Sequence, residues 1–100
     1  MGRKIARCED IAPGKKTIAS LEDGREIVIF NCDGEFYAIE NVCPHMGGPL
    51  GEGEMDGCTV VCPWHGWQFD IKSGSCINMP GENAKKIRIS VKDGFVCLDG

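Results

Sequence analysis

The chain has 100 residues, including 14 glycines, five prolines and seven cysteines, and its formal net charge is −4. This length predicts a single small domain spanning residues 1–100, and the acidic balance argues against nucleic acid as a partner. No apolar run approaches the roughly 20 residues that span a bilayer, and the N-terminal segment lacks the apolar core of a signal peptide. We therefore expect no membrane association and a cytoplasmic location.

Alternation of apolar and polar residues at a period of two recurs along the chain, as in half-buried antiparallel strands. The expected strands, in chain order, are 16–21, 25–30, 35–40, 58–61, 67–71, 85–91 and 95–98. Asp-Gly pairs at 23–24, 33–34 and 93–94 are strong hairpin signals. In the strand 85–91, we expect Ile87, Ile89 and Val91 to share the buried face. The pattern predicts an all-β fold, an antiparallel β-sandwich with residues 41–71 as a small inserted subdomain.

Two pairs of metal-ligating residue types lie inside the 41–71 segment, each at a loop beside an expected strand. Cys43 and His45 form a Cys-x-His pair, and Cys62 and His65 form a Cys-x-x-His pair. The four residues suit a structural zinc ion, or an iron-sulfur cluster with two cysteines on one iron and two histidines on the other. Structural zinc modules usually pair two cysteines in one knuckle. Because each loop here offers one residue of each type, the spacing favours the cluster, with zinc as the alternative.

The segments Cys43-Pro44-His45-Met46-Gly47 and Cys62-Pro63-Trp64-His65-Gly66 resemble the two cluster-binding loops of the Rieske 2Fe-2S family. The resemblance implies a Rieske-like sandwich holding one 2Fe-2S cluster, and residues 41–71 become its cluster-binding subdomain. It also implies that Cys43 and Cys62 bind the inner iron, while His45 and His65 bind the outer one. Residues 78–81 fall where the family has a proline-containing loop that covers the cluster.

Four positions depart from the family members of respiratory and photosynthetic complexes. The resemblance places the disulfide cysteines of those proteins at Gly48 and Trp64, and their hydroxyl donors to the cluster at Trp67 and Phe69. Loss of donors lowers the reduction potential. The segment 41–71 also carries four acidic residues and no Lys or Arg, which opposes an incoming electron. We therefore expect a potential of about −150 to −50 mV, within a family range of about −150 to +300 mV.

Nothing else in the sequence matches a nucleotide motif or a second set of metal ligands, so we expect an electron carrier and not an enzyme. The chain resembles the small soluble Rieske ferredoxins. That resemblance implies a flavin-dependent reductase as electron donor and a terminal oxygenase or similar reductase as acceptor. One alternative is the small Rieske subunit of an assimilatory nitrite reductase complex, and another is a structural zinc domain that only mediates contacts.

The remaining cysteines fall in or beside expected strands without partner spacing. Free cysteine is commonly a small buried hydrophobe, with a redox role as the alternative, and this is our interpretation of Cys8, Cys32, Cys58, Cys76 and Cys97.

Apolar and acidic side chains of the 41–71 segment offer two candidate surfaces. Trp64, with Met46, Pro49 and Leu50, is expected to form an apolar rim around the exposed edge of the cluster, for docking or for shielding. The acidic run Glu52, Glu54 and Asp56 is interpreted as a solvated hairpin or as a docking patch for a basic partner.

Overall fold

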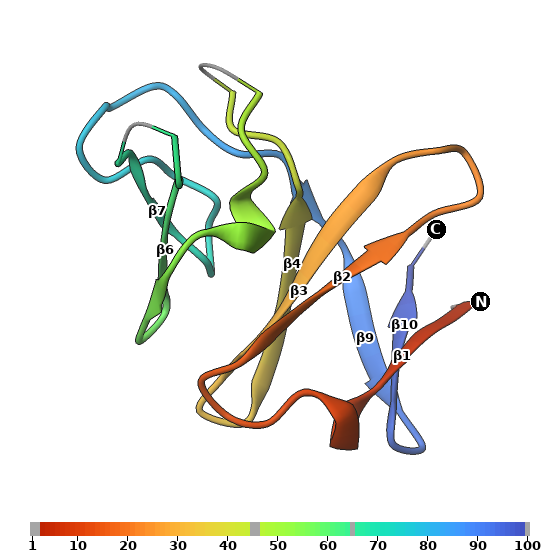
Figure 1. Cartoon of the computed structure of the whole chain (residues 1–100). Helices are drawn as coiled ribbons and strands as arrows, with labels where there is room; N and C mark the ends of the chain where they lie inside the picture. The colour runs from red at the N-terminus through yellow and green to blue at the C-terminus, as the bar shows by residue number, and fades with distance from the viewer. Residues whose placement is uncertain (1–2, 45–46, 65, 100) are drawn as a thin grey trace.

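Three antiparallel sheets make up the computed structural model, which describes residues 3–44, 47–64 and 66–99 (Figure 1). The first sheet has the order β1 (Arg3–Arg7), β10 (Phe95–Leu98), β9 (Ile89–Lys92). The second has the order β2 (Lys16–Ser20), β3 (Glu26–Cys32), β4 (Glu35–Glu40), β8 (Lys86–Ile87). The third has the order β5 (Met55–Asp56), β6 (Thr59–Val61), β7 (Gln68–Asp70). The expected all-β antiparallel class is confirmed.

Short helical turns are the only helical elements in these described ranges. They are η1 (Cys8–Asp10) and η2 (Leu50–Glu52). No helix of the described residues has the length and apolar character needed to cross a membrane.

Two of the three Asp-Gly hairpins form as the sequence predicts. Asp33 and Gly34 have φ angles of 53° and 94°, and Asp93 and Gly94 have φ angles of 54° and 80°. Both residues of each pair are left-handed, as a type I′ turn requires. At the third pair only Gly24 is left-handed, with φ of 92°, and its N–H donates to the Leu21 carbonyl at 3.0 Å. This hairpin therefore has a longer loop than a two-residue turn.

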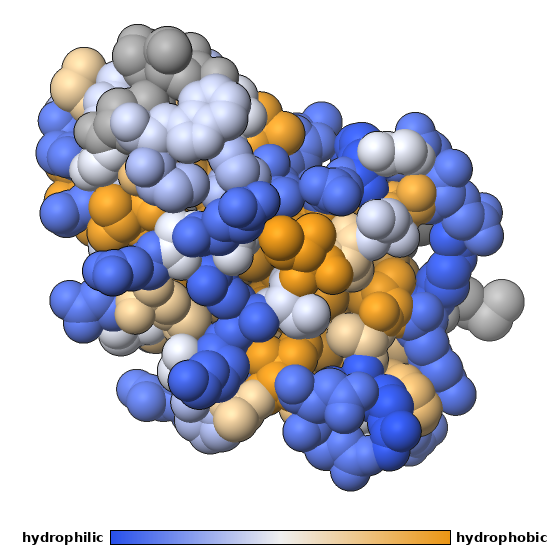
Figure 2. Space-filling model, viewed as in Figure 1, coloured by the Kyte–Doolittle hydropathy of each residue, from blue (hydrophilic) through white to orange (hydrophobic). Residues whose placement is uncertain are grey.

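Strand β3 lies at the centre of the fold, because alternate side chains enter two different cores. One, here called the sandwich core, lies between the first and second sheets and contains Ile11, Leu21, Ile27, Ile29, Ala38, Ile87 and Val96. The other, here called the loop core, lies between the second and third sheets. It contains Val28, Phe30, Cys32, Ile39, Cys43, Leu50, Val60, Cys62, Phe69, Ile71, Cys76 and Ala84. Figure 2 shows apolar residues gathered over β2 and β3 between hydrophilic margins.

The strand expected over 85–91 is divided, which corrects the prediction. Strand β8 pairs with β4 in the second sheet, whereas β9 pairs with β10 in the first. Ile87 is buried, but Val91 is 53% exposed although it pairs with the fully buried Val96. The reason is that β9 is the edge strand of its sheet, so that side chain has a neighbour on one side only.

Two strands were not expected from the sequence. The N-terminal strand β1 pairs with β10, and its register shifts between Lys4 and Ala6. Strand β5 pairs with β6 through only two residue pairs, Met55 with Val60 and Asp56 with Thr59. Both strands lie at sheet edges, where their own polar residues hide the alternation that marks a strand.

Candidate metal centre

The two loops that carry the cysteines close by the same backbone hydrogen bonds. In the first loop, the Cys43 N–H donates to the Gly48 carbonyl at 2.8 Å, and the Gly47 N–H donates to the Cys43 carbonyl at 2.8 Å. In the second, the Cys62 N–H donates to the Trp67 carbonyl at 2.7 Å, and the Gly66 N–H donates to the Cys62 carbonyl at 3.0 Å. Each loop therefore has a cysteine at its first position, and this cysteine makes the same two backbone hydrogen bonds, with the fifth and sixth residues of its loop.

The fifth residue of each loop is a glycine in the left-handed region. Gly47 has a φ of 77° and Gly66 a φ of 79°. Glycine adopts this conformation without the strain that a side chain would bring. The Cys-Pro start and the glycine at the fifth position are thus the sequence signal that the two loops share. The loops differ in the position of the histidine, which is third in one and fourth in the other.

The structure brings the two cysteines into one buried region. Cys43 and Cys62 are each 1% exposed, and both belong to the loop core. The loops touch directly, because a Cβ atom on Gly48 would lie 3.0 Å from the Cys62 sulfur. His45 and His65 lie outside the described residues, as does Met46.

Asn41 connects the first loop to the central strand. It is 6% exposed, its side-chain amide donates to Glu26 Oε1 at 3.2 Å, and its Oδ1 accepts the Gly51 N–H at 2.6 Å. These bonds hold η2 and β3 on either side of the segment that leads into Cys43. Sequence reasoning missed Asn41, for which the only signal was a polar residue at the end of an apolar strand.

Asn78 performs a similar task for the second loop. Its Oδ1 accepts the Gln68 N–H at 3.1 Å and the Cys76 thiol at 3.3 Å. The next residues form a turn in which the Glu82 N–H donates to the Met79 carbonyl at 3.2 Å, with Pro80 and a left-handed Gly81 between them. Pro followed by left-handed Gly is typical of a type II turn. The segment 78–82 is thereby attached to the strand that follows Trp67.

The surface around the loops differs in part from the expected apolar rim. Trp64 is 60% exposed, but Leu50 is fully buried in the loop core, because η2 turns that side chain inward. Pro49 is half-buried. Three more exposed apolar residues, which the sequence did not predict for this surface, are Val42 next to Cys43 and the two neighbours of Asn78, Ile77 and Met79.

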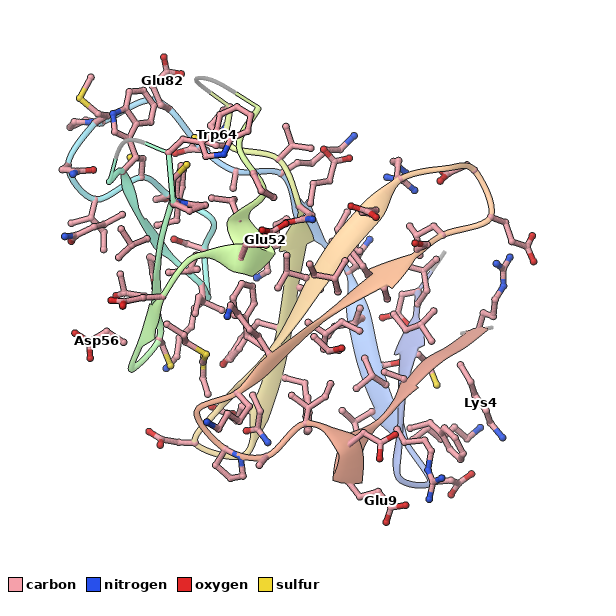
Figure 3. The ribbon with its side chains drawn as sticks, in the orientation of Figure 1. Lys4, Glu9, Glu52, Asp56, Trp64 and Glu82 are labelled. Atoms are coloured by element: carbon pink, nitrogen blue, oxygen red, sulfur yellow. The ribbon has the colours of Figure 1, made fainter. Side chains whose placement is uncertain are left out.

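An acidic groove runs beside the second loop. It has a volume of about 430 Å³, and its lining includes Trp64, Pro63, Glu52 and Glu54. Figure 3 shows Trp64 and Glu52 on neighbouring segments, with Lys4 and Glu9 at the opposite end of the molecule. The ion pairs found within the described ranges all lie outside 41–71, so they leave the groove's charges unneutralised.

The other cysteines are packed as small apolar residues, which agrees with the sequence interpretation. Cys32, Cys76 and Cys97 are buried, Cys8 and Cys58 are half-buried, and none of the five forms a disulfide. Burial and a hydrogen bond with the Cys58 thiol raise the pKa of Cys32 to about 12. A thiol with that pKa stays protonated and unreactive at neutral pH.

The described geometry defines a class: a small antiparallel β protein with two equivalent cysteine loops in contact at one end. The sequence model of the Rieske [2Fe-2S] domain matches residues 3–92. The chain belongs to the Rieske domain family, a family of iron-sulfur proteins.

Curated relatives agree with this membership. The chain is 33% identical, over 97 residues, to the ferredoxin component of the p-cumate 2,3-dioxygenase system of Pseudomonas putida, covering 95% of this chain and 82% of that protein. It is 38% identical, over 85 residues, to Cholesterol 7-desaturase nvd of Hemicentrotus pulcherrimus, but spans only 18% of that longer protein. The same unit therefore also occurs within larger chains.

Solved structures share the whole fold. A ferredoxin of Sphingomonas yanoikuyae B1 superposes with a TM-score of 0.91 at 28% identity, over 100% of this chain and 99% of that one. A chain from a complex of reduced oxygenase and oxidized ferredoxin in carbazole 1,9a-dioxygenase gives 0.90 at 27% identity, over 99% and 93%. A chain described as a nitrite reductase NADPH small subunit gives 0.84 at 24% identity, over 100% and 99%, and this likeness concerns the fold alone.

Proposed function

We propose that the chain binds one 2Fe-2S cluster through Cys43, His45, Cys62 and His65, and carries single electrons between a reductase and a terminal oxygenase. The observation that supports this most is the contact between two equivalent loops, each starting at a buried cysteine. The chain is a carrier within an oxidoreductase system and not itself a catalyst. Residues 41–71 act as its cluster-binding subdomain, and the whole chain acts as one domain in the cytoplasm.

The donor set fits the cluster. Two thiols and two imidazoles are the ligands of a Rieske centre, which accepts and releases one electron at a time when bound. The 1% exposure of Cys43 and Cys62 suits ligands of the inner iron. The described neighbours of the two histidines are exposed, namely Pro44, Gly47, Trp64 and Gly66. This exposure supports an electron path through imidazoles near the surface.

The proposed partners follow from the relatives and from the charge of the groove. Two of the similar proteins are ferredoxins of dioxygenase systems, one of them from a complex with its oxygenase. These relatives support a terminal oxygenase as acceptor, and the resemblance to the soluble Rieske ferredoxins implies a flavin-dependent reductase as donor. The groove carboxylates, Glu52 and Glu54, fit a basic docking surface. A nitrite reductase small subunit is the second candidate, supported by the shared fold.

Purification without oxygen tests the cluster and its ligands. The protein should be red-brown, bleach on reduction, and contain about two irons and two sulfides per chain. Cys43→Ser or Cys62→Ser should abolish the colour, whereas Ser at Cys8, Cys32, Cys58, Cys76 or Cys97 should preserve it. A colourless protein with zinc would overturn the proposal, and iron loss in one of the five control variants would reassign the ligands.

The partner assignment is tested by reduction kinetics. If Glu52 and Glu54 steer a basic partner, the association rate should fall as salt rises, and Glu52→Lys with Glu54→Lys should lower it at low salt. Glu9→Lys with Asp10→Lys is the matched control, because it makes the same double charge change on two exposed residues of η1. An association rate that depends on neither salt nor charge reversal would exclude the groove as the docking surface. Stable co-purification with a larger reductase subunit would favour the second candidate.

A further inference from the structure

Gly48 of the first loop is buried against two groups of the second loop. A Cβ atom there would lie 3.0 Å from the Cys62 sulfur, 3.0 Å from Trp64 Cδ2 and 3.1 Å from Trp64 Cγ. Gly47 and Gly66 have positive φ angles, but Gly48 does not. The constraint at position 48 is therefore one of space, because the ring or the sulfur would have to move by a few tenths of an ångström to admit a Cβ atom.

Trp64 has two different surroundings. Its ring atoms Cγ and Cδ2 pack against Gly48, yet the side chain as a whole is 60% exposed and lines the groove with Glu52 and Glu54. Beneath this contact, Gly48 is buried and Cys62 is 1% exposed. The indole therefore packs over the place where the first loop meets the Cys62 sulfur, at the edge of the groove that Cys62 also lines.

The hydrogen bonds described above close each loop within itself. The packing of Trp64 on Gly48 is a different kind of contact, since it joins one loop to the other. A flat, rigid side chain against a residue with no side chain allows the two loop backbones to approach closely. Removal of the indole ring would expose the contact between the two loops and let water reach the Cys62 sulfur.

We propose that Trp64 is a positioning residue of the metal centre, which holds the second loop on Gly48 and keeps water from the Cys62 sulfur. This inference rests on the proposed function, because it requires a cluster on Cys62. Solvent access to cluster sulfurs is one of the factors that set the potential of an iron-sulfur centre. Water stabilises the additional negative charge of the reduced form, so exclusion of water keeps the potential low.

Trp64→Ala is the first test, with two measurements that need no partner protein. Iron transfer to a chelator should become several-fold faster than in the wild type, and the midpoint potential should shift to a higher value. Trp64→Phe keeps an aromatic ring over Gly48 and should stay nearer to the wild type in both measurements. Val91→Ala is the matched control, because it truncates another exposed apolar side chain, 53% exposed, on β9. It should change neither measurement.

Gly48→Ala tests the contact from the other loop. The added methyl group would press on the indole, and the rate of iron transfer should rise. If the indole is the group displaced, adding Gly48→Ala to Trp64→Ala should change that rate less than Gly48→Ala does alone, because two of the three close contacts are already gone.

The outcomes separate this inference from the proposed function. A wild-type protein without iron, sulfide or visible absorption would overturn the proposed function. A wild-type protein with its cluster, and a Trp64→Ala variant with unchanged transfer rate and potential, would overturn the role of Trp64. The role of Trp64 would also be overturned if Gly48→Ala changed the iron transfer rate equally in the wild type and in the Trp64→Ala variant. If Trp64→Ala fails to assemble the cluster, the same two measurements on Trp64→Phe and Gly48→Ala decide, and wild-type values in both variants would reject the role.

Discussion

The sandwich core and the loop core lie on opposite faces of β3, yet they are built in different ways. The sandwich core is aliphatic, and regular strands supply most of it, Ile27 and Ile29 from β3 and Val96 from β10 among them. The loop core contains four cysteines and two phenylalanines, and much of it comes from loops. Glycines of those loops contact groups distant in sequence, as Gly48 does with Cys62. One face thus depends on filling space with side chains, and the other also depends on leaving side chains out.

This difference explains why one small chain can carry a metal site. The sandwich gives a rigid base whose stability comes from burial of apolar surface. The loops above it hold backbone close to backbone, which places two cysteines together without a large core of their own. Substitutions in the sandwich core should therefore lower stability, whereas substitutions in the loop core should also disturb the metal site.

The largest effect is expected at Gly53, on the loop side. A Cβ atom there would lie 1.7 Å from the Val61 carbonyl oxygen, so Gly53→Ala cannot fit without moving β6. We expect a loss of about 5 kcal/mol or more in the free energy of unfolding, or no folded protein. Gly57→Ala is the matched control: that glycine has a φ of 60° but nothing within 4 Å, so the loss should be about 1–2 kcal/mol. Urea unfolding measures both, and equal losses would contradict the difference between the two positions.

Neighbouring residues of β3 offer a direct comparison of its two faces. Phe30→Ala should remove about 3–5 kcal/mol and Ile29→Ala about 2–5 kcal/mol, because both side chains are fully buried. Only Phe30 shares the loop core with Cys43 and Cys62. Phe30→Ala should therefore also speed iron transfer to a chelator. Ile29→Ala should leave the transfer rate unchanged, measured under conditions in which both variants remain folded. Similar transfer rates in the two variants would mean that the cores are not independent.

A pH dependence is expected from the loop core. The Cys32 thiol has a pKa of about 12 in the folded protein, raised from 9.0 first by burial and then by its hydrogen bond with Cys58. Above pH 9 the unfolded chain loses this proton while the folded chain keeps it, so stability is lost as pH rises from about 9 towards 12. The loss is about 1.4 kcal/mol per pH unit. Urea titrations of wild type and Cys32→Ala should converge over this range, and parallel curves would reject the assignment.

The smallest effect concerns the reduction potential. Phe69 is fully buried in the loop core, to which the two cysteines also belong, and Phe69→Tyr adds one hydroxyl at nearly constant shape. If that hydroxyl donates to a cysteine sulfur, the midpoint should rise by roughly 20–60 mV, the equivalent of one hydrogen bond. Phe36→Tyr is the matched control, because Phe36 packs against the sandwich core and should leave the potential unchanged.

The wild-type midpoint tests the expected low range itself. A value of about −150 to −50 mV agrees with a centre that lacks hydroxyl donors and lies in an acidic segment. A midpoint above about +100 mV would show that other groups set the potential.

The sequence by itself determined those features that depend on neighbouring residues. The type I′ turns at Asp33-Gly34 and Asp93-Gly94 follow from residues that tolerate left-handed backbone. The Cys-Pro start and left-handed glycine of each cysteine loop are local in the same way, and the Cys and His spacing was enough to propose the ligands. The all-β class follows from alternation, which is readable wherever a strand has one buried face.

Only the tertiary structure decided how distant segments meet. The division of the expected strand 85–91 into β8 and β9 depends on two different pairing partners, β4 and β10, which no local pattern specifies. The burial of Leu50 depends on how η2 lies on the second sheet. The spatial constraint at positions 48 and 53 depends on Cys62, Trp64 and Val61, from the other side of the site. Such contacts are set by packing between elements, whereas a local residue pattern reflects only the requirements of a single strand or turn.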